Sequence, residues 1–256
     1  MRFIRYKTGS EAPRYGWIYE DRVGPIEGEP FGEFRRLDAE IPLHMIQILA
    51  PVVPGKIICV GRNYAEHAKE QNVEVPEIPL LFMKPPSSVI GTGDTIILPP
   101  QSSRVEHEGE LGVVIGRTGR WIAAENALSY VFGYTVANDV TARDLQRKDG
   151  QWTRGKGFDT FCPLGPWIET ELNPTDVLVQ TRVNGEMRQM ASTREMMFPV
   201  EQLIAFISSI MTLNPGDLIL TGTPAGIGPL SPGDVVEVSV EGIGALQNSV
   251  AAEKAR

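Results

Sequence analysis

Three acidic residues of the chain could share one divalent cation. Glu108 and Glu110 precede the apolar run Leu111–Ile115, and Asp139 ends a second apolar run. Successive side chains of a strand point to opposite faces, so Glu108 and Glu110 would lie on the same face. Two carboxylates near a core repel each other, and a shared cation removes that repulsion. Oxygen ligands suit Mg²⁺ or Mn²⁺ better than zinc, and Lys156 would lie beside the ion.

Each piece of this pattern also has an ordinary structural interpretation. A Glu-x-Glu pair is usually the solvated face of a strand, and an acidic residue after a strand is usually a turn or cap residue. Spacing alone favours this interpretation over a metal site. Glu106 and His107 flank the pair and could contact the metal ligands, but the favoured interpretation is that they are ordinary surface residues.

Two further segments carry residues suited to substrate chemistry. His67 and Glu70 would be neighbours on one face of a helix, as a general base and the group that orients it, although exposed helices often carry such a pair without a catalytic role. The glycine-rich segment 221–228 lacks the ending of a P-loop and opens no helix, which excludes both nucleotide-binding loops. It could bring backbone N–H groups and the Thr223 hydroxyl to a small anion, or simply connect two strands.

Short strands dominate the secondary structure that the sequence predicts. Apolar stretches bounded by turn residues predict strands at 2–7, 15–19, 56–60, 80–83, 95–98, 177–183, 187–190, 218–220, 236–240 and 245–250. Asn184-Gly185 predicts a two-residue hairpin turn. The strict alternation in 236–240 predicts a half-buried strand at a sheet edge. This pattern favours a strand-rich α+β fold over a doubly wound sheet.

Four helices complete the prediction. The first runs from Asn63, as N-cap, to about Gln71, and short helices follow at 124–131 and at 141–148, the latter capped by Thr141. The longest begins at Pro199 and presents one apolar face. The breaker-rich segment 51–55 divides a small β-rich N-terminal module, residues 1–52, from a catalytic domain, residues 53–256.

The composition is that of an ordinary globular chain. Its 256 residues are 42% apolar and 22% charged. A net charge of −8 argues against nucleic acid as a partner, but a local cation still allows a small anionic substrate. The two cysteines stand apart from any metal or disulfide motif. With no signal peptide or membrane-spanning run recognised, we expect a cytoplasmic protein without a membrane partner.

Several motifs together resemble the fumarylacetoacetate hydrolase family, over roughly residues 55–250. In the family's order they are Gly61-Arg-Asn-Tyr-Ala-Glu-His67, Leu81-Phe-Met-Lys-Pro85, Glu108-Gly-Glu-Leu-Gly-Val-Val114, Asn138-Asp-Val-Thr-Ala-Arg-Asp144, Lys156-Gly-Phe-Asp159 and Thr221-Gly-Thr-Pro224. The resemblance implies a mixed β-roll/β-sandwich catalytic domain, usually a homodimer, that binds Mg²⁺ or Mn²⁺ and a 2-oxo or β-diketo acid.

The resemblance also implies roles for individual residues. The matching positions are Glu108, Glu110 and Asp139 as metal ligands, Lys156 beside the metal, Arg143, Gln146 and Thr223 at the substrate, and His67 with Glu70 as a catalytic pair on a lid helix. The segment from Asp139 to Lys156 is shorter than in some relatives, which leaves the substrate open.

The chemistry expected from this resemblance passes through a metal-stabilised enolate of a short 2-oxo acid. We expect decarboxylation or keto–enol tautomerisation of oxaloacetate, or C–C hydrolysis of an acylpyruvate. A rival within the same fold is a 2-hydroxyhepta-2,4-diene-1,7-dioate isomerase or 5-oxopent-3-ene-1,2,5-tricarboxylate decarboxylase. A rival of another class is a 2-oxo-acid-binding protein without catalytic activity.

Overall fold

The computed structural model describes residues 1–72 and 74–254, and strands dominate it. The α-helices are α1 (Ala65–Glu70), α2 (Arg143–Asp149), α3 (Thr153–Lys156) and α4 (Val200–Ile210), and the 3₁₀ turns are η1 (Leu43–Met45), η2 (Pro86–Ser88), η3 (Ala124–Tyr130) and η4 (Thr193–Glu195). The strands are β1 (Arg2–Lys7), β2 (Arg14–Tyr19), β3 (Arg22–Gly28), β4 (Phe34–Arg36), β5 (Ile41–Pro42), β6 (Gln47–Leu49), β7 (Ile57–Gly61), β8 (Leu80–Lys84), β9 (Val89–Ile90), β10 (Thr95–Leu98), β11 (Val105–His107), β12 (Gly109–Ile115), β13 (Val131–Asn138), β14 (Thr141–Ala142), β15 (Cys162–Glu169), β16 (Leu178–Val183), β17 (Glu186–Ser192), β18 (Leu218–Leu220), β19 (Gly228–Pro229), β20 (Val235–Val240) and β21 (Gly244–Ala252). The predicted strand-rich α+β class is confirmed.

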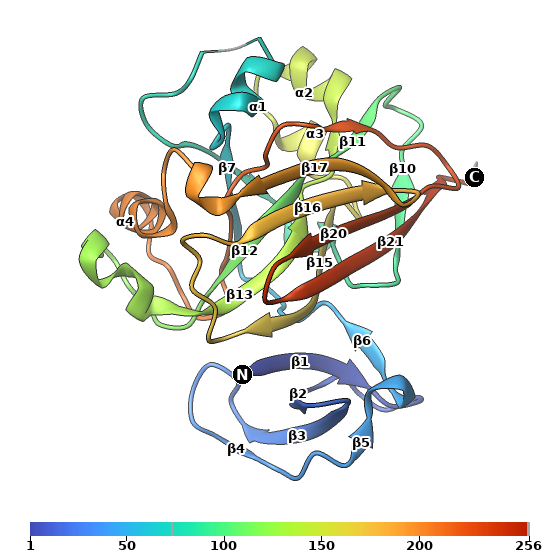
Figure 1. Ribbon diagram of the computed structural model, residues 1–256, viewed down its shortest axis with the longest axis vertical. Coiled ribbons are helices and arrows are strands. Elements are labelled where there is room, and N and C mark those ends of the chain that lie inside the picture. Colours follow the sequence, from blue (N-terminus) through green and yellow to red (C-terminus); the bar gives the residue numbers. More distant parts are fainter. Residues whose placement is uncertain (73, 255–256) are drawn as a thin grey trace.

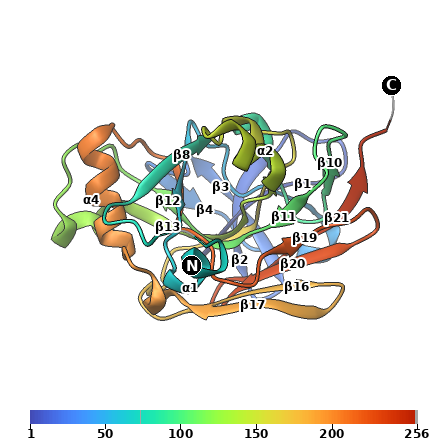
Figure 2. The same ribbon diagram turned by 90° about the horizontal axis from the view of Figure 1, so that it is seen from above.

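The strands form one large sheet, a five-stranded sheet and a small three-stranded sheet. Their orders are β4-β3-β2-β1-β15-β13-β12-β18-β7-β8, β10-β21-β20-β16-β17 and β14-β11-β19, with β5, β6 and β9 pairing at the side of the large sheet. The long helix α4 lies at one side of the body (Figure 2). Among the described residues, no helix combines the length and the apolar character needed to cross a membrane.

Strand β12 lies in the interior of the large sheet and is buried along its whole length. Leu111 and Val113 belong to one apolar cluster with Val179 and Val238 of the five-stranded sheet. Val114 belongs to a second cluster. Because both faces of β12 are covered, its sequence is apolar without alternation, and its position is fixed by the packing on either side.

The N-terminal strands β1 to β6 lie at the end of the molecule opposite the short helices α1, α2 and α3 (Figure 1). They are joined to the rest by pairing of β1 with β15, in which Phe3 lies opposite Ile168. The ring of Phe3 also meets the Phe132 ring edge-on, with centroids 4.9 Å apart. This module therefore extends the large sheet rather than hanging from a linker.

Two predicted helix caps are wrong. Helix α1 begins at Ala65, and the side chain of Asn63 instead bonds the backbone of Phe198 and Thr221. Thr141 belongs to strand β14 and its hydroxyl donates to the Asp139 carbonyl. Both side chains satisfy backbone groups from outside their own helix, which local sequence does not reveal. The predicted helix at 124–131 is the 3₁₀ turn η3.

The C-terminal half of the chain follows the prediction more closely. Asn184 and Gly185 both have positive φ and connect β16 to β17 as a hairpin. Helix α4 follows Pro199. Strand β20 alternates as expected but lies between β16 and β21, so its predicted edge position is wrong. Its outward side chains are half-buried, which resembles an edge strand in sequence.

Candidate active site

The candidate site residues gather at one edge of the large sheet. Strands β7 and β18 are parallel neighbours, so both end at this edge. Strand β12 runs antiparallel to β18 and to β13, so it begins where they end. The segments that follow β7, β13 and β18 therefore meet the residues at the start of β12.

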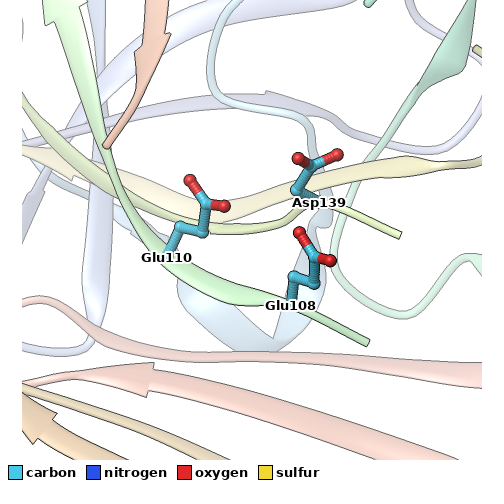
Figure 3. Close-up of side chains that lie close together, drawn as sticks. All are labelled: Glu108, Glu110 and Asp139. Carbon is cyan, nitrogen blue, oxygen red and sulfur yellow. The ribbon is translucent and has the colours of Figure 1, made fainter. Parts of the chain in front are cut away.

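Glu108, Glu110 and Asp139 form a buried carboxylate cluster there. The Asp139 N–H donates to the Glu108 carbonyl over 2.8 Å, because the residue after β13 lies opposite the residue before β12. One oxygen from each carboxyl group lies within 4.8 Å of the other two, and all three residues are at most 4% exposed. Figure 3 shows the three carboxyl groups gathered in one space, with Glu108 and Glu110 on the same side of their strand. The solvated-strand interpretation of this pair is wrong.

Glu108 and Asp139 are neutralised by buried cations. The Lys156 ammonium donates to Glu108 Oε2 over 2.7 Å and to Asp139 Oδ2 over 2.6 Å, and Lys84 donates to Asp139 Oδ1 over 2.6 Å. Arg143 forms a further ion pair with Glu108. Burial alone would raise the pKa of the Glu108 carboxyl, but the charges of Lys156 and Arg143 outweigh it and hold that pKa well below its usual range.

Glu110 has no such partner. Its Oε2 accepts the Gly222 N–H over 2.7 Å, and no cationic side chain of residues 1–72 and 74–254 lies within ion-pair distance of it. Burial and the charges of Asp139 and Glu108 raise its pKa well above the usual range. A divalent cation among the three carboxylates would supply the missing positive charge, so this oxygen-only donor set fits a hard ion such as Mg²⁺ or Mn²⁺.

Glu106 and His107 are buried, so the prediction that they are surface residues is wrong. Strand β11, which carries them, is covered on both sides by β14 and β19. Glu106 accepts Arg143 Nε over 2.7 Å. Arg143 in turn donates to Gln146 Oε1 over 2.5 Å. Arg143 and Gln146, two of the predicted substrate-binding residues, thus lie side by side. Glu106 fixes the Arg143 guanidinium next to Glu108 of the carboxylate cluster.

His67 and Glu70 lie on α1 at the rim of the same site. His67 Nδ1 is 3.3 Å from Glu70 Oε2, and the Gly226 N–H donates to the Glu70 carboxylate over 3.1 Å. Burial lowers the pKa of His67, outweighing the opposing effects of Glu108 and Glu70. The lowered pKa favours the neutral imidazole, the form that can accept a proton. Since Nδ1 faces a carboxylate it carries the proton, which leaves Nε2 as the acceptor.

The Thr223 hydroxyl is engaged by the protein itself. It donates to the Gly109 carbonyl over 2.8 Å and accepts Gln189 Nε2 over 2.7 Å. Gln189 is fully buried, and its Oε1 accepts the Gly109 N–H over 3.0 Å and lies 3.1 Å from His107 Nδ1. The side chain of Thr223 thus fixes the loop after β18. Within the described chain, its backbone N–H has no protein acceptor.

These groups lie around one pocket of about 320 Å³. Of the predicted site residues, His67, Glu108, Glu110, Arg143, Gln146, Lys156 and Thr223 line it. Asp139 lies behind Lys156, and Glu70 reaches the site through His67. All nine predicted residues therefore belong to one region of the structure.

The sequence pattern assigned no role to several residues of this region. Lys84 ends an apolar strand and is completely buried, and a charged residue in that position was the available signal. Arg62 and Trp152 also line the pocket. Neither stands in a spacing pattern that points to a site.

Comparisons with known proteins agree with this geometry. A family model described as fumarylacetoacetate (FAA) hydrolase C-terminal matches residues 56–251, and one described as Rv2993c-like, N-terminal, matches residues 1–51. The chain is 48% identical over 231 residues to the mitochondrial oxaloacetate tautomerase Fahd2a of Rattus norvegicus, covering 84% of this chain and 74% of that protein.

Two solved structures are similar over nearly the whole chain. The 5-carboxymethyl-2-hydroxymuconate delta-isomerase from Mycobacterium smegmatis is 44% identical with a TM-score of 0.93, and 99% of this chain covers all of it. Maleylpyruvate hydrolase from Sphingobium sp. SYK-6, solved with manganese(II) ion and pyruvate, is 30% identical with a TM-score of 0.81 at 99% and 100% coverage.

The fold and the buried carboxylate cluster define an enzyme with a site suited to a divalent metal. The chain belongs to the fumarylacetoacetate hydrolase family, which confirms the resemblance seen in the sequence. The division into two domains at residue 52 stays a prediction, as do the roles of the individual site residues.

Proposed function

We propose that this protein is a Mg²⁺- or Mn²⁺-dependent enzyme that moves a proton next to the keto group of a short 2-oxo acid, with keto–enol tautomerisation of oxaloacetate as its reaction. The observation that carries this proposal is the His67–Glu70 pair, whose imidazole lines the same pocket as Glu108, Glu110 and Lys156. The similarity to a tautomerase and to an isomerase supports it, since both rearrange a substrate without adding or removing atoms.

The residues of the site have different roles in this proposal. Glu108, Glu110 and Asp139 would hold the cation, which when bound would act as a Lewis acid toward the keto oxygen. Lys156 adds a fixed positive charge beside the same oxygen. The unpaired Thr223 N–H is available to the substrate's first carboxylate.

Proton transfer falls to His67. Its Nε2 would take a proton from C3, so that the C3–H bond breaks, the C2–C3 double bond forms and the electron pair of the C2=O π bond moves onto the oxygen; the imidazolium would then give that proton to this oxygen, which completes the enol. Glu70 stabilises the imidazolium that forms in between. Return of the proton to C3 by the same group runs the reaction in the other direction.

Isomerisation of a 2-hydroxy-diene dicarboxylic acid is the second candidate. It is favoured by the full-length similarity to the hydroxymuconate isomerase, and it requires only proton transfers of the same kind. Decarboxylation of oxaloacetate and hydrolysis of an acylpyruvate require in addition the loss of CO₂ or the attack of water.

The experiment follows each reaction by its product, using metal-stripped protein with added Mg²⁺. We expect the enol absorbance of oxaloacetate to decay faster than in buffer without release of pyruvate. Release of pyruvate instead would assign decarboxylation, and turnover of acetylpyruvate alone would assign hydrolysis. Turnover of a 2-hydroxyhepta-2,4-diene-1,7-dioate alone would assign the second candidate. Binding of oxaloacetate without any conversion would assign the non-catalytic alternative.

A further inference from the structure

Arg62 lines the pocket but has no role in the chemistry described so far. It follows strand β7 directly, is half-buried, and faces the same cavity as Glu108 and His67. Its guanidinium carbon lies 5.5 Å from the centre of the Trp152 ring. Stacking on an aromatic ring restrains a guanidinium and leaves its N–H groups free at the edge.

The backbone holds Arg62 in an unusual conformation. Its φ is +60°, in the left-handed region that L residues other than glycine rarely adopt. The next residue, Asn63, is fully buried and its side chain is hydrogen-bonded to Phe198 and Thr221, which pins the chain at this point. The start of the Arg62 side chain is therefore fixed by the fold, as is common for residues at functional sites.

No carboxylate neutralises Arg62. In the described part of the chain no acidic group lies within 4.0 Å of its guanidinium, whereas Arg143 and Lys156 are both ion-paired. Partial burial and the charge of Arg143 lower the pKa of Arg62. The negative charge of an anion bound beside Arg62 would raise this pKa again.

The aromatic rings of Trp152 and Phe82 connect Arg62 to Lys156 through a series of contacts. Lys156 Nζ lies 4.8 Å from the centre of the Phe82 ring, and the rings of Phe82 and Trp152 pack edge-on with centroids 5.1 Å apart. Arg62 contacts the Trp152 ring in turn, and all four residues line the pocket. This series of contacts therefore has a cationic side chain at each end, Arg62 and Lys156, and two uncharged aromatic rings between them in the series.

We propose that Arg62 binds the second carboxylate of a dicarboxylic substrate and so selects 2-oxo dicarboxylic acids over 2-oxo acids with an uncharged tail. The inference rests on the proposed function, in which the first carboxylate and the keto group lie at the carboxylate cluster. A planar guanidinium offers two parallel N–H groups to a carboxylate, a geometry that a lysine does not reproduce.

Binding of unreactive analogues tests Arg62 separately from catalysis. Malate carries two carboxylates, and 2-hydroxybutyrate has a methyl group in place of the second. Calorimetry in Mg²⁺ on the full-length wild type and on Arg62→Met compares the two ligands. We expect Arg62→Met to weaken malate roughly 10- to 100-fold, the range for a hydrogen bond to a charged group, and to change 2-hydroxybutyrate less than about twofold.

The control is Arg36→Met, since Arg36 also stacks on a tryptophan, Trp17 at 4.8 Å, but lies on the N-terminal strand β4. We expect it to leave both affinities unchanged. Arg62→Lys should recover only part of the malate affinity.

The proposal is overturned if wild type binds malate no more tightly than 2-hydroxybutyrate, or if Arg62→Met weakens both ligands equally. The same proteins assayed with oxaloacetate separate the two claims. Selective loss of malate binding together with an inactive wild type would contradict the proposed reaction and support the Arg62 assignment. If wild type converts oxaloacetate and Arg62→Met changes neither kcat nor KM, that result would support the proposed reaction and contradict the Arg62 assignment.

Discussion

At the scale of single residues, the site is organised by unequal charge balance among three carboxylates. Glu108 and Asp139 have buried cationic partners, and Glu110 has only the Gly222 N–H. The Lys156 ammonium keeps its charge despite burial, because Asp139 and Glu108 outweigh desolvation and raise its pKa. Glu110 is therefore the carboxylate whose charge would be balanced mainly by a bound divalent cation.

Replacing Glu110 by Gln should stabilise the metal-free protein and abolish its response to metal. The folded state raises the pKa of this carboxyl, so metal-free wild type binds the proton more tightly when folded. Its stability should fall as the pH rises above the ordinary glutamate value of about 4.3 toward the folded pKa. At pH 8 we expect the variant to be about 2 kcal/mol more stable.

Urea unfolding between pH 5 and 8, with and without Mn²⁺, measures this difference. Mn²⁺ should stabilise wild type only. Glu186→Gln, on an exposed part of β17, is the matched control. A variant as strongly stabilised by Mn²⁺ as wild type would contradict the role of Glu110.

Replacing Glu70 by Gln should slow proton transfer and move its pH dependence. The Glu70 side chain raises the pKa of His67, which burial holds below its usual 6.5. Loss of that carboxylate should lower the pKa further, so the acid limb of kcat shifts to lower pH while kcat at pH 7 falls about 10²-fold. Glu66→Gln, on the exposed face of the same helix, should change neither. An acid limb that stays in place in Glu70→Gln would show that His67 acts without Glu70.

At the scale of elements, four strand ends position the site and the three short helices α1, α2 and α3 complete it. Helix α3 brings Lys156 to the cluster by packing closely on α2. A Cβ on Gly155 would lie 2.8 Å from the Gln146 backbone nitrogen, so only glycine allows this contact.

Gly155→Ala should therefore move Lys156 out of place. Overpacking of this size costs about 1–3 kcal/mol in stability, and we expect kcat to fall more than tenfold. Gly32→Ala, at an exposed position where the added Cβ would lie 3.3 Å from the Glu29 Cβ, is the milder control and should leave kcat unchanged. Steady-state kinetics and thermal unfolding measure both variants. If kcat is unchanged in Gly155→Ala, the close contact between α2 and α3 is not what positions Lys156 for the reaction.

The elements also show what the sequence could predict. Strand periodicity correctly put Glu108 and Glu110 on one face, and the run before Asp139 correctly marked a strand end. Asn63 and Gln189 escaped prediction because their partners lie far along the chain. A buried amide that bonds distant backbone leaves no local pattern, and the same is true of the buried Lys84.

At the scale of the whole molecule, the net charge of −8 contrasts with a pocket in which cationic side chains outnumber the lining carboxylates of Glu108 and Glu110. Arg62, Arg143, Arg147 and Lys156 all face this one cavity. An anionic substrate would therefore be attracted locally although the surface as a whole repels it. The predicted homodimer and cytoplasmic location rest on resemblance and composition and stay predictions.

The most direct measurement is the rate of oxaloacetate tautomerisation as a function of bound Mn²⁺, starting from metal-stripped protein. We expect one Mn²⁺ to bind per chain, the rate to rise in proportion to the bound ion, and Glu110→Gln to show neither. A rate that is the same without metal as with it, in protein shown to be metal-free, would contradict the central claim that the carboxylate cluster acts through a divalent cation.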